Sequence, residues 1–462
     1  MTLPVRFRLF STFLVAIILV AACVDVAPAV TPSPTASPAA SPTRQPSPSP
    51  TTTLAPPTQS AAPSATPNTS GSPGPTDSAT PGPTVDPALA APIDAVIAQV
   101  PHIRDLEPTA DVPYEFITRD KFRDDLMALN DENVPPEVRA AEERFLKRLG
   151  LLPPDADMEA LILELYGASV AAFYRPDNGR FYIIERDQPF GPSDKIVVSH
   201  EYTHALQDQH FDLEERQISD PFEGDAALGQ LAVIEGDASL TSQLWATDNL
   251  TPDEMFELLM ESLGELDQPT LAGMPLVLRR QLEFPYVEGL LFVTSLHDQE
   301  GYDGVDAALQ APPASTEQIL HPEKYFGGEA PVDVEVADLL GQLDDGWISV
   351  YEQTMGELGI QILAVGGEEP DFNIPGLPVD WPHSEVAAGW AGDRLSMYEG
   401  PEGAWLIDWL TTWDTQADAG EFEARIAELE GSFAGPARVD TTQQGVRVRV
   451  ASSEQLLFDC CR

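Results

Sequence analysis

Apolar residues recur every three or four positions over much of the chain from about residue 92 onward, which is the spacing of amphipathic helices. Proline suits the first turn of a helix, so Pro285 predicts the start of one helix of this set. The set predicted from apolar spacing and end signals comprises helices over 119–129, 136–149, 157–166, 195–210, 225–245, 286–299, 347–363 and 418–429, with further helices opening at Thr251 and Ser315.

Short β-prone runs alternate with these helices and predict strands. Two of the connections carry strong turn signals, Pro176-Asp177-Asn178-Gly179 and Gly400-Pro401-Glu402-Gly403, and each predicts a hairpin. The predicted strands cover 114–118, 171–174, 181–184, 394–398, 404–413 and 446–450. The mixture predicts an α+β fold, with a small α+β unit closing the chain.

The first residues read as an export signal. Arg6 and Arg8 precede an apolar run from Leu9 to Val20, which is too short for a comfortable membrane span. The small residues Ala21 and Ala22 then lead to Cys23, and this ending resembles a bacterial lipoprotein signal. The resemblance implies a signal peptide over 1–22, diacylation of Cys23 and anchorage outside the cytoplasm, on the cell membrane. Plain secretory cleavage, which leaves the protein free, is the alternative.

Residues 23–90 are dominated by Pro, Ser, Thr, Ala and Gly, with almost no large apolar side chain. Such a segment cannot bury enough surface to offset the entropy of ordering it, so we expect a disordered tether. The remaining chain is long enough for a large core. We expect one domain over 91–330 and a C-terminal α+β region over 331–462.

The net charge limits the classes of binding partner, and the cysteine content limits the disulfides that can form. The formal net charge is −50, which argues against binding of nucleic acid or docking on anionic lipid. Once Cys23 is assigned to the lipid, only the adjacent Cys460 and Cys461 remain. Neighbouring cysteines pair only with strain, so free thiols or an intermolecular bridge are expected rather than a structural disulfide.

The stretch over 195–210 carries the pattern H-E-x-x-H. His200 and His204 lie one turn apart on one helical face, where two imidazoles can bind one zinc ion. Glu201 is then beside the metal, placed to take a proton from an activated water rather than to bind the ion. The simpler alternative is two stacked histidines on an ordinary core helix.

A second helix, over 225–245, carries Glu235 among apolar residues. Its carboxylate is therefore expected to point into the protein with the apolar face. An unpaired buried carboxylate costs several kcal/mol, and a metal ion would offset that cost.

Together, His200, Glu201 and His204, followed by Glu235 on a later helix, resemble the gluzincin division of zinc metallopeptidases. The resemblance covers roughly 168–245, with helical support to about Tyr325. It implies a zincin-like domain with a hairpin-bearing upper part and a helical lower part. It also implies one zinc ion held by the two histidines and Glu235, and hydrolysis of peptide or protein substrates with Glu201 as the general base.

One alternative lies inside the same helix. His210 follows His200 by ten residues, the spacing at which metzincins place a third histidine ligand. That pattern needs a glycine where this chain has Gln207, because the helix must turn sharply there. Both Glu235 and His210 are thus candidates for the third ligand, with Glu235 preferred.

The resemblance is incomplete in two places. Several gluzincins carry an aspartate four residues after the glutamate ligand, where this chain has Ser239, so support for a histidine ligand must come from Asp237, Asp208 or another group. The donor that stabilises the developing oxyanion is also open. Tyr286 is preferred for that role; the other two candidates are His297 and His321.

A function of a different class is compatible with the same residues. The chain can be a non-catalytic lipoprotein, a binding or scaffold module with a degenerate or structural metal site. Glu201 argues against this alternative, because a structural zinc site has no use for a base and usually fills its fourth position with protein.

Overall fold

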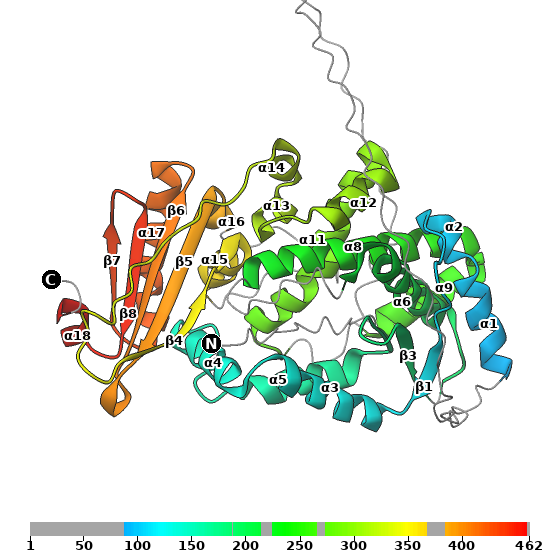
Figure 1. Ribbon diagram of the computed structural model, residues 1–462, viewed down its shortest axis with the longest axis horizontal. Coiled ribbons are helices and arrows are strands. Elements are labelled where there is room, and N and C mark those ends of the chain that lie inside the picture. Colours follow the sequence, from blue (N-terminus) through cyan, green and yellow to red (C-terminus); the bar gives the residue numbers. More distant parts are fainter. Residues whose placement is uncertain (1–86, 187, 214–223, 266–272, 367–383, 460–462) are drawn as a thin grey trace, which may run out of the picture. The chain divides into compact units, whose positions relative to one another are not determined.

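The computed structural model describes residues 87–186, 188–213, 224–265, 273–366 and 384–459 (Figure 1). The predicted signal peptide, the lipid site at Cys23, most of the predicted tether and the cysteine pair Cys460 and Cys461 lie outside these residues. Helix α1 (Pro87–Ile97) begins within the last residues assigned to the tether, and α2 (Val100–Arg104) follows it.

A three-stranded sheet lies next to the H-E-x-x-H helix. Its order is β1-β3-β2, from β1 (Tyr114–Ile117), β3 (Arg180–Ile184) and β2 (Ala172–Arg175). Strands β2 and β3 are antiparallel and pair Ala172 with Ile183, which confirms the hairpin predicted from the Asn-Gly turn. Strand β1 runs parallel to β3, and β2 is left at an edge.

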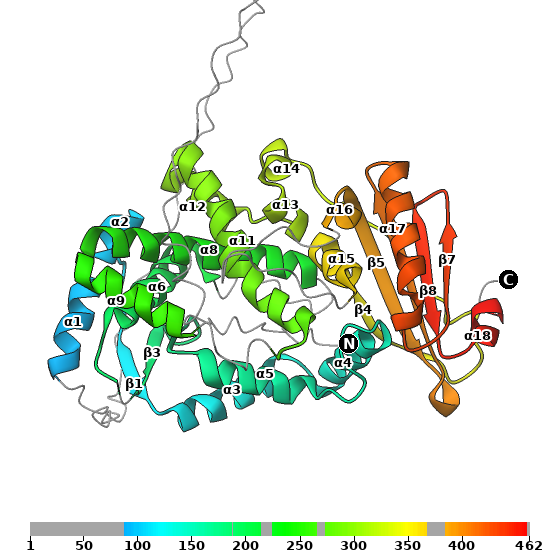
Figure 2. The same cartoon turned by 180° about the vertical axis from the view of Figure 1, so that it is seen from behind.

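Helices follow or flank this sheet. Helix α6 (Pro192–Phe211) comes directly after the hairpin and packs on α8 (Gly224–Asn249), while α11 (Leu276–Glu300) runs along α8, as the green helices of Figures 1 and 2 show. Among the described residues up to 327, the other helices are α3 (Arg119–Asn133), α4 (Pro136–Arg148), α5 (Met158–Ser169), α9 (Pro252–Glu265), α12 (Tyr302–Gln310), α13 (Thr316–Leu320) and α14 (Pro322–Gly327).

The predicted start of a helix at Pro285 is wrong. Pro285 lies inside α11, which begins nine residues earlier at Leu276. A proline inside a helix costs about 3 kcal/mol. Phe284, Pro285 and Tyr286 are all buried, so packing of this helix against its neighbours outweighs the local preference.

The C-terminal region forms a five-stranded sheet in the order β4-β5-β6-β8-β7, with every neighbouring pair antiparallel. Helix α17 (Gln416–Leu429) packs against β6 and β7 and is seen in front of the sheet in Figure 2. The strands are β4 (Ile348–Gln353), β5 (Trp390–Glu399), β6 (Trp405–Trp413), β7 (Ala437–Thr441) and β8 (Val446–Ala451); the remaining helices are α15 (Gly356–Val365), α16 (Ser384–Ala387) and α18 (Glu454–Asp459).

The single helix predicted over 347–363 is also wrong. Its first half is strand β4, which pairs with β5, and its second half is helix α15. Gly356 separates the two with a φ of 67°, a left-handed conformation that favours glycine. The apolar spacing over 347–363 therefore belongs to a strand followed by a helix, not to one helix.

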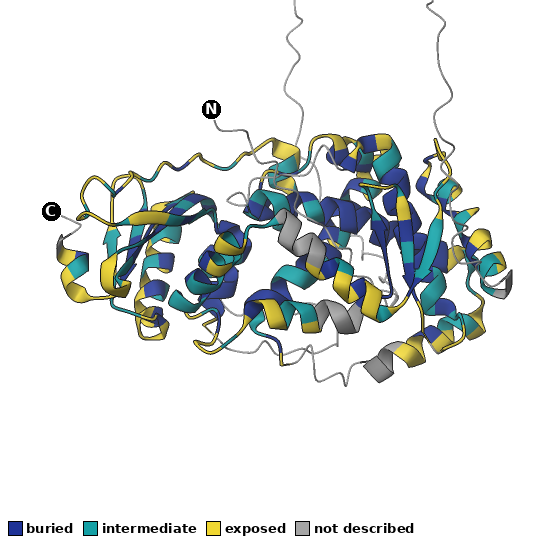
Figure 3. Ribbon diagram, turned by 60° about the horizontal axis from the view of Figure 1, so that its bottom comes forward, coloured by how far each residue is buried: buried dark blue, intermediate teal, exposed yellow. Residues whose placement is uncertain are grey.

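One large hydrophobic core joins the helical part to the C-terminal sheet. Buried residues, in dark blue in Figure 3, gather within β2, β5, β6 and β8 and along α6 and α8, whereas exposed residues, in yellow, gather on outlying helices and loops. Trp390 and Trp409 are core residues of the second sheet. The fold is thus mixed α+β, as the sequence predicted.

Candidate metal centre

Helix α6 places His200, Glu201 and His204 in the interior. Its first turn is closed by Asp194, whose carboxylate accepts a hydrogen bond from the Gly191 backbone N–H at 2.8 Å. The two histidine rings meet edge to face, with centroids 4.6 Å apart. All three side chains are 0% exposed, so this turn of α6 lies within the core.

Helix α8 brings Glu235 to these histidines. Glu235 Oε2 lies 3.1 Å from His200 Nε2 and 3.5 Å from His204 Nε2. Two ligand atoms bound to one tetrahedral zinc ion at ordinary distances lie about 3.3 Å apart. The three side chains, which we call the metal cluster, therefore have the donor types and the spacing of a His₂Glu zinc site.

Burial and charge act in opposite directions within the metal cluster. Burial lowers the pKa of His200 to about 4, despite the neighbouring Glu235 carboxylate, so this ring is neutral and can bind a metal. Burial also works to raise the pKa of Glu235, but its attraction to His204 and hydrogen bonding to both rings lower it overall. Burial works to lower the pKa of His204, but the charges of Glu235 and Glu201 and the hydrogen bonds to Glu235 and Gln207 together raise it.

Glu201 is buried without a well-formed hydrogen bond. Neither carboxylate oxygen has a partner of good geometry among the described residues, although the backbone N–H of Tyr174 in β2 faces it. Burial raises the pKa of Glu201 to about 8. A buried carboxyl group normally finds donors, so its isolation here indicates a group kept for a ligand or a reaction.

His210 does not join the metal cluster. It lies in the last turn of α6, its side chain is exposed, and its Nε2–H donates to the Glu107 carbonyl at 2.8 Å. The predicted alternative third ligand is therefore not brought to the other two histidines. Since α6 continues to Phe211, the sharp turn that the metzincin spacing requires is absent from this helix.

One of the three candidate oxyanion donors, Tyr286, packs beside the metal cluster. Its ring faces His200 at 6.2 Å between centroids and 27° between planes. The other two have partners elsewhere: the His297 ring packs edge-on against Tyr302, and His321 Nε2 lies 3.0 Å from Glu357 Oε1.

The position of Tyr286 depends on a close approach of α11 to α8. A Cβ added to Gly236 would lie 2.2 Å from the Gly289 carbonyl oxygen, and one added to Gly289 would lie 2.2 Å from that of Ala232. Only glycine allows both contacts. Gly236 follows Glu235 directly, so the same crossing sets the depth of the carboxylate and of the tyrosine.

Support for His204 comes from a residue that sequence reasoning did not select. His204 Nδ1 is hydrogen-bonded to Gln207 Oε1 at 2.8 Å, and Gln207 in turn reaches Asp237. The other proposed support, Asp208, accepts from the Tyr174 hydroxyl at 2.7 Å instead. The sequence feature that could have indicated this contact is the three-residue spacing of His204 and Gln207 on one helix.

A second group of carboxylates already has a positive charge from the protein at its centre. Glu317, Glu329 and Asp414 surround Lys324, whose Nζ lies 2.6, 2.9 and 2.9 Å from their oxygens. We call these four residues the lysine cluster. Because an ammonium occupies the position that a cation would take, this group is not a metal-site candidate.

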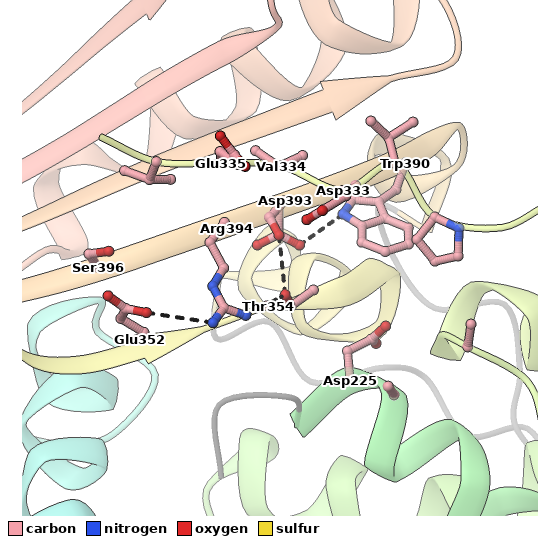
Figure 4. A pocket seen from close by; sticks show the side chains of 16 residues that line it. Asp225, Asp333, Val334, Glu335, Glu352, Thr354, Trp390, Asp393, Arg394 and Ser396 are labelled. Atoms are coloured by element: carbon pink, nitrogen blue, oxygen red, sulfur yellow. Dashed lines mark hydrogen bonds and ion pairs between the residues drawn. The ribbon is translucent and has the colours of Figure 1, made fainter. Parts of the chain in front are cut away.

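A polar cavity of about 480 Å³ lies away from the metal cluster, lined by the start of α8, residues 331–336 and strands β4 and β5 (Figure 4). One of its buried carboxylates, Asp393, accepts hydrogen bonds from two indole and two backbone N–H groups, at 2.8–3.0 Å. With its acceptor sites filled, Asp393 holds the C-terminal sheet together and is not a binding group.

Comparison with known proteins identifies only the C-terminal region. Residues 348–457, from β4 into α18, match a family described as "Domain of unknown function (DUF8575)". The match lies beyond the metal cluster and covers less than a quarter of the chain. No curated protein and no solved structure matches the chain.

Proposed function

We propose that the protein is a zinc-dependent metallopeptidase of the gluzincin type, with a zincin-like arrangement of hairpin, α6 and α8. The observation that carries the proposal is the convergence of His200, His204 and Glu235 around one point, with the unpartnered Glu201 beside them. Two neutral-capable imidazoles and a carboxylate are the donors of known catalytic zinc sites. The buried base is what distinguishes this arrangement from a structural site.

In this proposal, His200 and His204 would hold zinc through Nε2 and Glu235 through its carboxylate. When bound, zinc supplies Lewis acidity that polarises a scissile carbonyl and acidifies water. Glu201 accepts a proton from the attacking water and returns it to the leaving amine. A nearby divalent cation favours the ionised form of Glu201, which burial alone disfavours.

Two further groups fit the reaction. The Tyr286 hydroxyl is the proposed donor to the oxyanion, since its ring lies over His200. The substrate backbone is proposed to pair with β2, one of the two edge strands of the first sheet, whose Tyr174 backbone faces Glu201. An extended peptide on this edge would pass beside the general base.

The proposal requires that a peptide substrate can reach the buried metal cluster and Glu201. The side chains of His200, Glu201, His204 and Glu235 are 0–1% exposed, so a peptide reaches them only after part of their cover moves. The same burial is what a non-catalytic module with a structural metal site predicts. The isolated Glu201 favours the peptidase, because such a module gains nothing from an unpaired buried carboxyl group.

The test compares wild-type protein with Glu201→Gln, both loaded with zinc, in a casein-type cleavage assay. We expect both to hold about one zinc per chain and Glu201→Gln to lose about 10²- to 10⁴-fold in turnover, because an amide cannot act as the base. If the wild type cleaves no peptide, or Glu201→Gln cleaves as fast, the peptidase is rejected and the binding module is favoured.

We also propose that the enzyme is held outside the cytoplasm by lipid on Cys23, with residues 23–90 as the tether. No helix in the described part of the chain is both long and apolar enough to cross a membrane. The test is fractionation of cells that express wild type or Cys23→Ala. Wild type should sediment with membranes and incorporate labelled lipid; a Cys23→Ala protein that still sediments wholly with membranes would contradict the anchor.

A further inference from the structure

Two side chains connect His204 to Arg104, a residue about a hundred positions earlier in the sequence. Gln207, Asp237 and Arg104 follow one another from the metal cluster toward α2, all of them 0% exposed. We propose that Gln207, Asp237 and Arg104 form a positioning relay that fixes the tautomer and the ring orientation of His204. This inference rests on the metal site of the proposed function and adds the residues that prepare it.

The orientation of the Gln207 amide follows from its surroundings. Gln207 Nε2 lies 3.0 Å from the Ile234 carbonyl oxygen and 2.7 Å from Asp237 Oδ2, and both of these groups can only accept. The amide oxygen must therefore face His204 Nδ1, 2.8 Å away. Because an amide oxygen accepts, Nδ1 carries the hydrogen.

This hydrogen bond leaves His204 Nε2 with the lone pair. Nε2 is the atom that faces Glu235 Oε2, at 3.5 Å, on the side of the metal cluster. A histidine that binds metal through one nitrogen usually donates from the other, which fixes its ring and raises its basicity. Gln207 thus performs the role for which an aspartate was expected, and its own orientation depends on Asp237.

Arg104 in turn holds Asp237. Its Nε lies 2.7 and 2.9 Å from the two Asp237 oxygens, and its Nη2 lies 2.5 Å from Asp306 Oδ1. The guanidinium also stacks over the Tyr302 ring, 4.4 Å from its centroid. These contacts to α8 and α12 fix the guanidinium, so Asp237 has one position from which to accept the Gln207 hydrogen bond.

A purely structural role explains this arrangement poorly. A fully buried Arg–Asp pair generally stabilises a fold no better than apolar residues of similar volume, because desolvation offsets the attraction. Asp237 also accepts a hydrogen bond from the Gln207 amide, which in turn orients His204. The relay therefore indicates selection for the geometry of the metal ligand.

The test measures zinc affinity by competition with a chromophoric chelator, using the full chain, for wild type, Gln207→Leu, Arg104→Met and the control Gln209→Leu. Gln209 lies on the same helix and bonds to Thr109 and Ala110, away from the metal cluster. We expect Gln207→Leu to weaken zinc binding about 10- to 100-fold and Arg104→Met about tenfold, and Gln209→Leu to match wild type.

A second readout separates positioning from loss of fold. With cobalt(II) in place of zinc, the visible absorption bands report ligand geometry, and we expect them to shift in Gln207→Leu and Arg104→Met but not in Gln209→Leu. Far-ultraviolet circular dichroism checks that each variant is folded; for a variant that is not, Gln207→Met and Arg104→Lys take its place. Wild-type affinity and wild-type bands in a folded Gln207→Leu, Gln207→Met or Arg104→Met protein overturn the relay; Arg104→Lys, which keeps a donor to Asp237, should weaken binding less than Arg104→Met.

The two proposals fail in different ways. A wild-type protein that binds zinc tightly but cleaves no peptide contradicts the peptidase and leaves the relay supported by the affinities. A wild-type protein that binds neither zinc nor cobalt overturns the relay together with the metal site on which it rests.

Discussion

The metal cluster and the lysine cluster are both groups of acidic or metal-binding side chains whose ligand atoms lie within 4.8 Å of one another. In the lysine cluster, Lys324 supplies the positive charge from within the protein. In the metal cluster, no lysine or arginine among the described residues bridges the ligand atoms. The proximity of carboxylates therefore indicates a cation site only where the protein has not already supplied the cation.

Two buried carboxyl groups show the same contrast. Asp393 in the C-terminal sheet accepts four N–H groups, whereas Glu201 beside the metal cluster has no well-formed hydrogen bond among the described residues. A satisfied carboxylate holds a fold together, and an unsatisfied one is retained at a cost in stability. Asp393 is thus explained by structure, while Glu201 calls for a function.

The largest effect on stability is expected at Asp393. Asp393→Ala leaves two indole and two backbone N–H groups without an acceptor, so the free energy of unfolding should fall by at least about 3 kcal/mol. Asp393→Asn, which keeps an acceptor oxygen, should lose less. Urea unfolding measures both. Unchanged stability in Asp393→Ala would contradict the structural role assigned to Asp393 in contrast to Glu201. As a control, the zinc content of both Asp393 variants should equal that of the wild type.

A loss of similar size, but dependent on zinc, is expected at the metal cluster. Zinc at about 100 times its dissociation constant should stabilise the wild type by about 2.7 kcal/mol over the metal-free protein. His204→Ala should lose this increment because binding and folding are linked. Thermal unfolding with and without zinc measures it, and an equal zinc-dependent shift in both proteins would contradict the assignment of His204.

Without its lysine, the lysine cluster should behave more like the metal cluster and respond to an added cation. Lys324→Met leaves the buried Glu317 beside two other carboxylates without a cation, which should cost roughly 1–3 kcal/mol. Millimolar calcium should then raise the melting temperature of Lys324→Met and leave that of the wild type unchanged, because oxygen ligands suit calcium. A calcium response in the wild type would contradict the view that Lys324 fills this position.

A dependence of stability on pH is expected at the same cluster. Burial raises the pKa of Glu317 from 4.5 to about 7, although Lys324 acts to lower it. Folding therefore favours the protonated form, and the contribution of Glu317 to stability is lost as pH rises from about 4.5 to about 7. Glu317→Gln should reduce this slope in urea unfolding; a steeper slope would reverse the sign assigned to the group.

Much of the helical part could be predicted from the sequence because its signals are local. Apolar spacing predicted α6 and α8, the Asn-Gly turn predicted the β2–β3 hairpin, and Ser315 was placed correctly at the start of α13, where its hydroxyl accepts from Gln318. Glu235 was expected to face inward because its neighbours are apolar, and the structure has it 1% exposed.

The rest depended on contacts between distant segments. Arg104 lies 133 positions before Asp237, and no local pattern relates them. Pro285 is a local signal for a helix start that packing overrides, and strand β4 exists through its pairing with β5 rather than through its own periodicity. In the sequence, Gln207 is notable only because it stands where metzincins have a glycine. Its role depends on groups of α8, which the local sequence does not contain.

The central claim, that the metal cluster holds zinc and the lysine cluster does not, is tested most directly by measuring zinc per chain in wild type, Glu235→Gln and Glu329→Gln. The two substitutions are chemically identical and fall in the two clusters. We predict about one zinc per chain in wild type and in Glu329→Gln, and a large loss in Glu235→Gln. No zinc in the wild type, or equal zinc in all three proteins, would contradict the account.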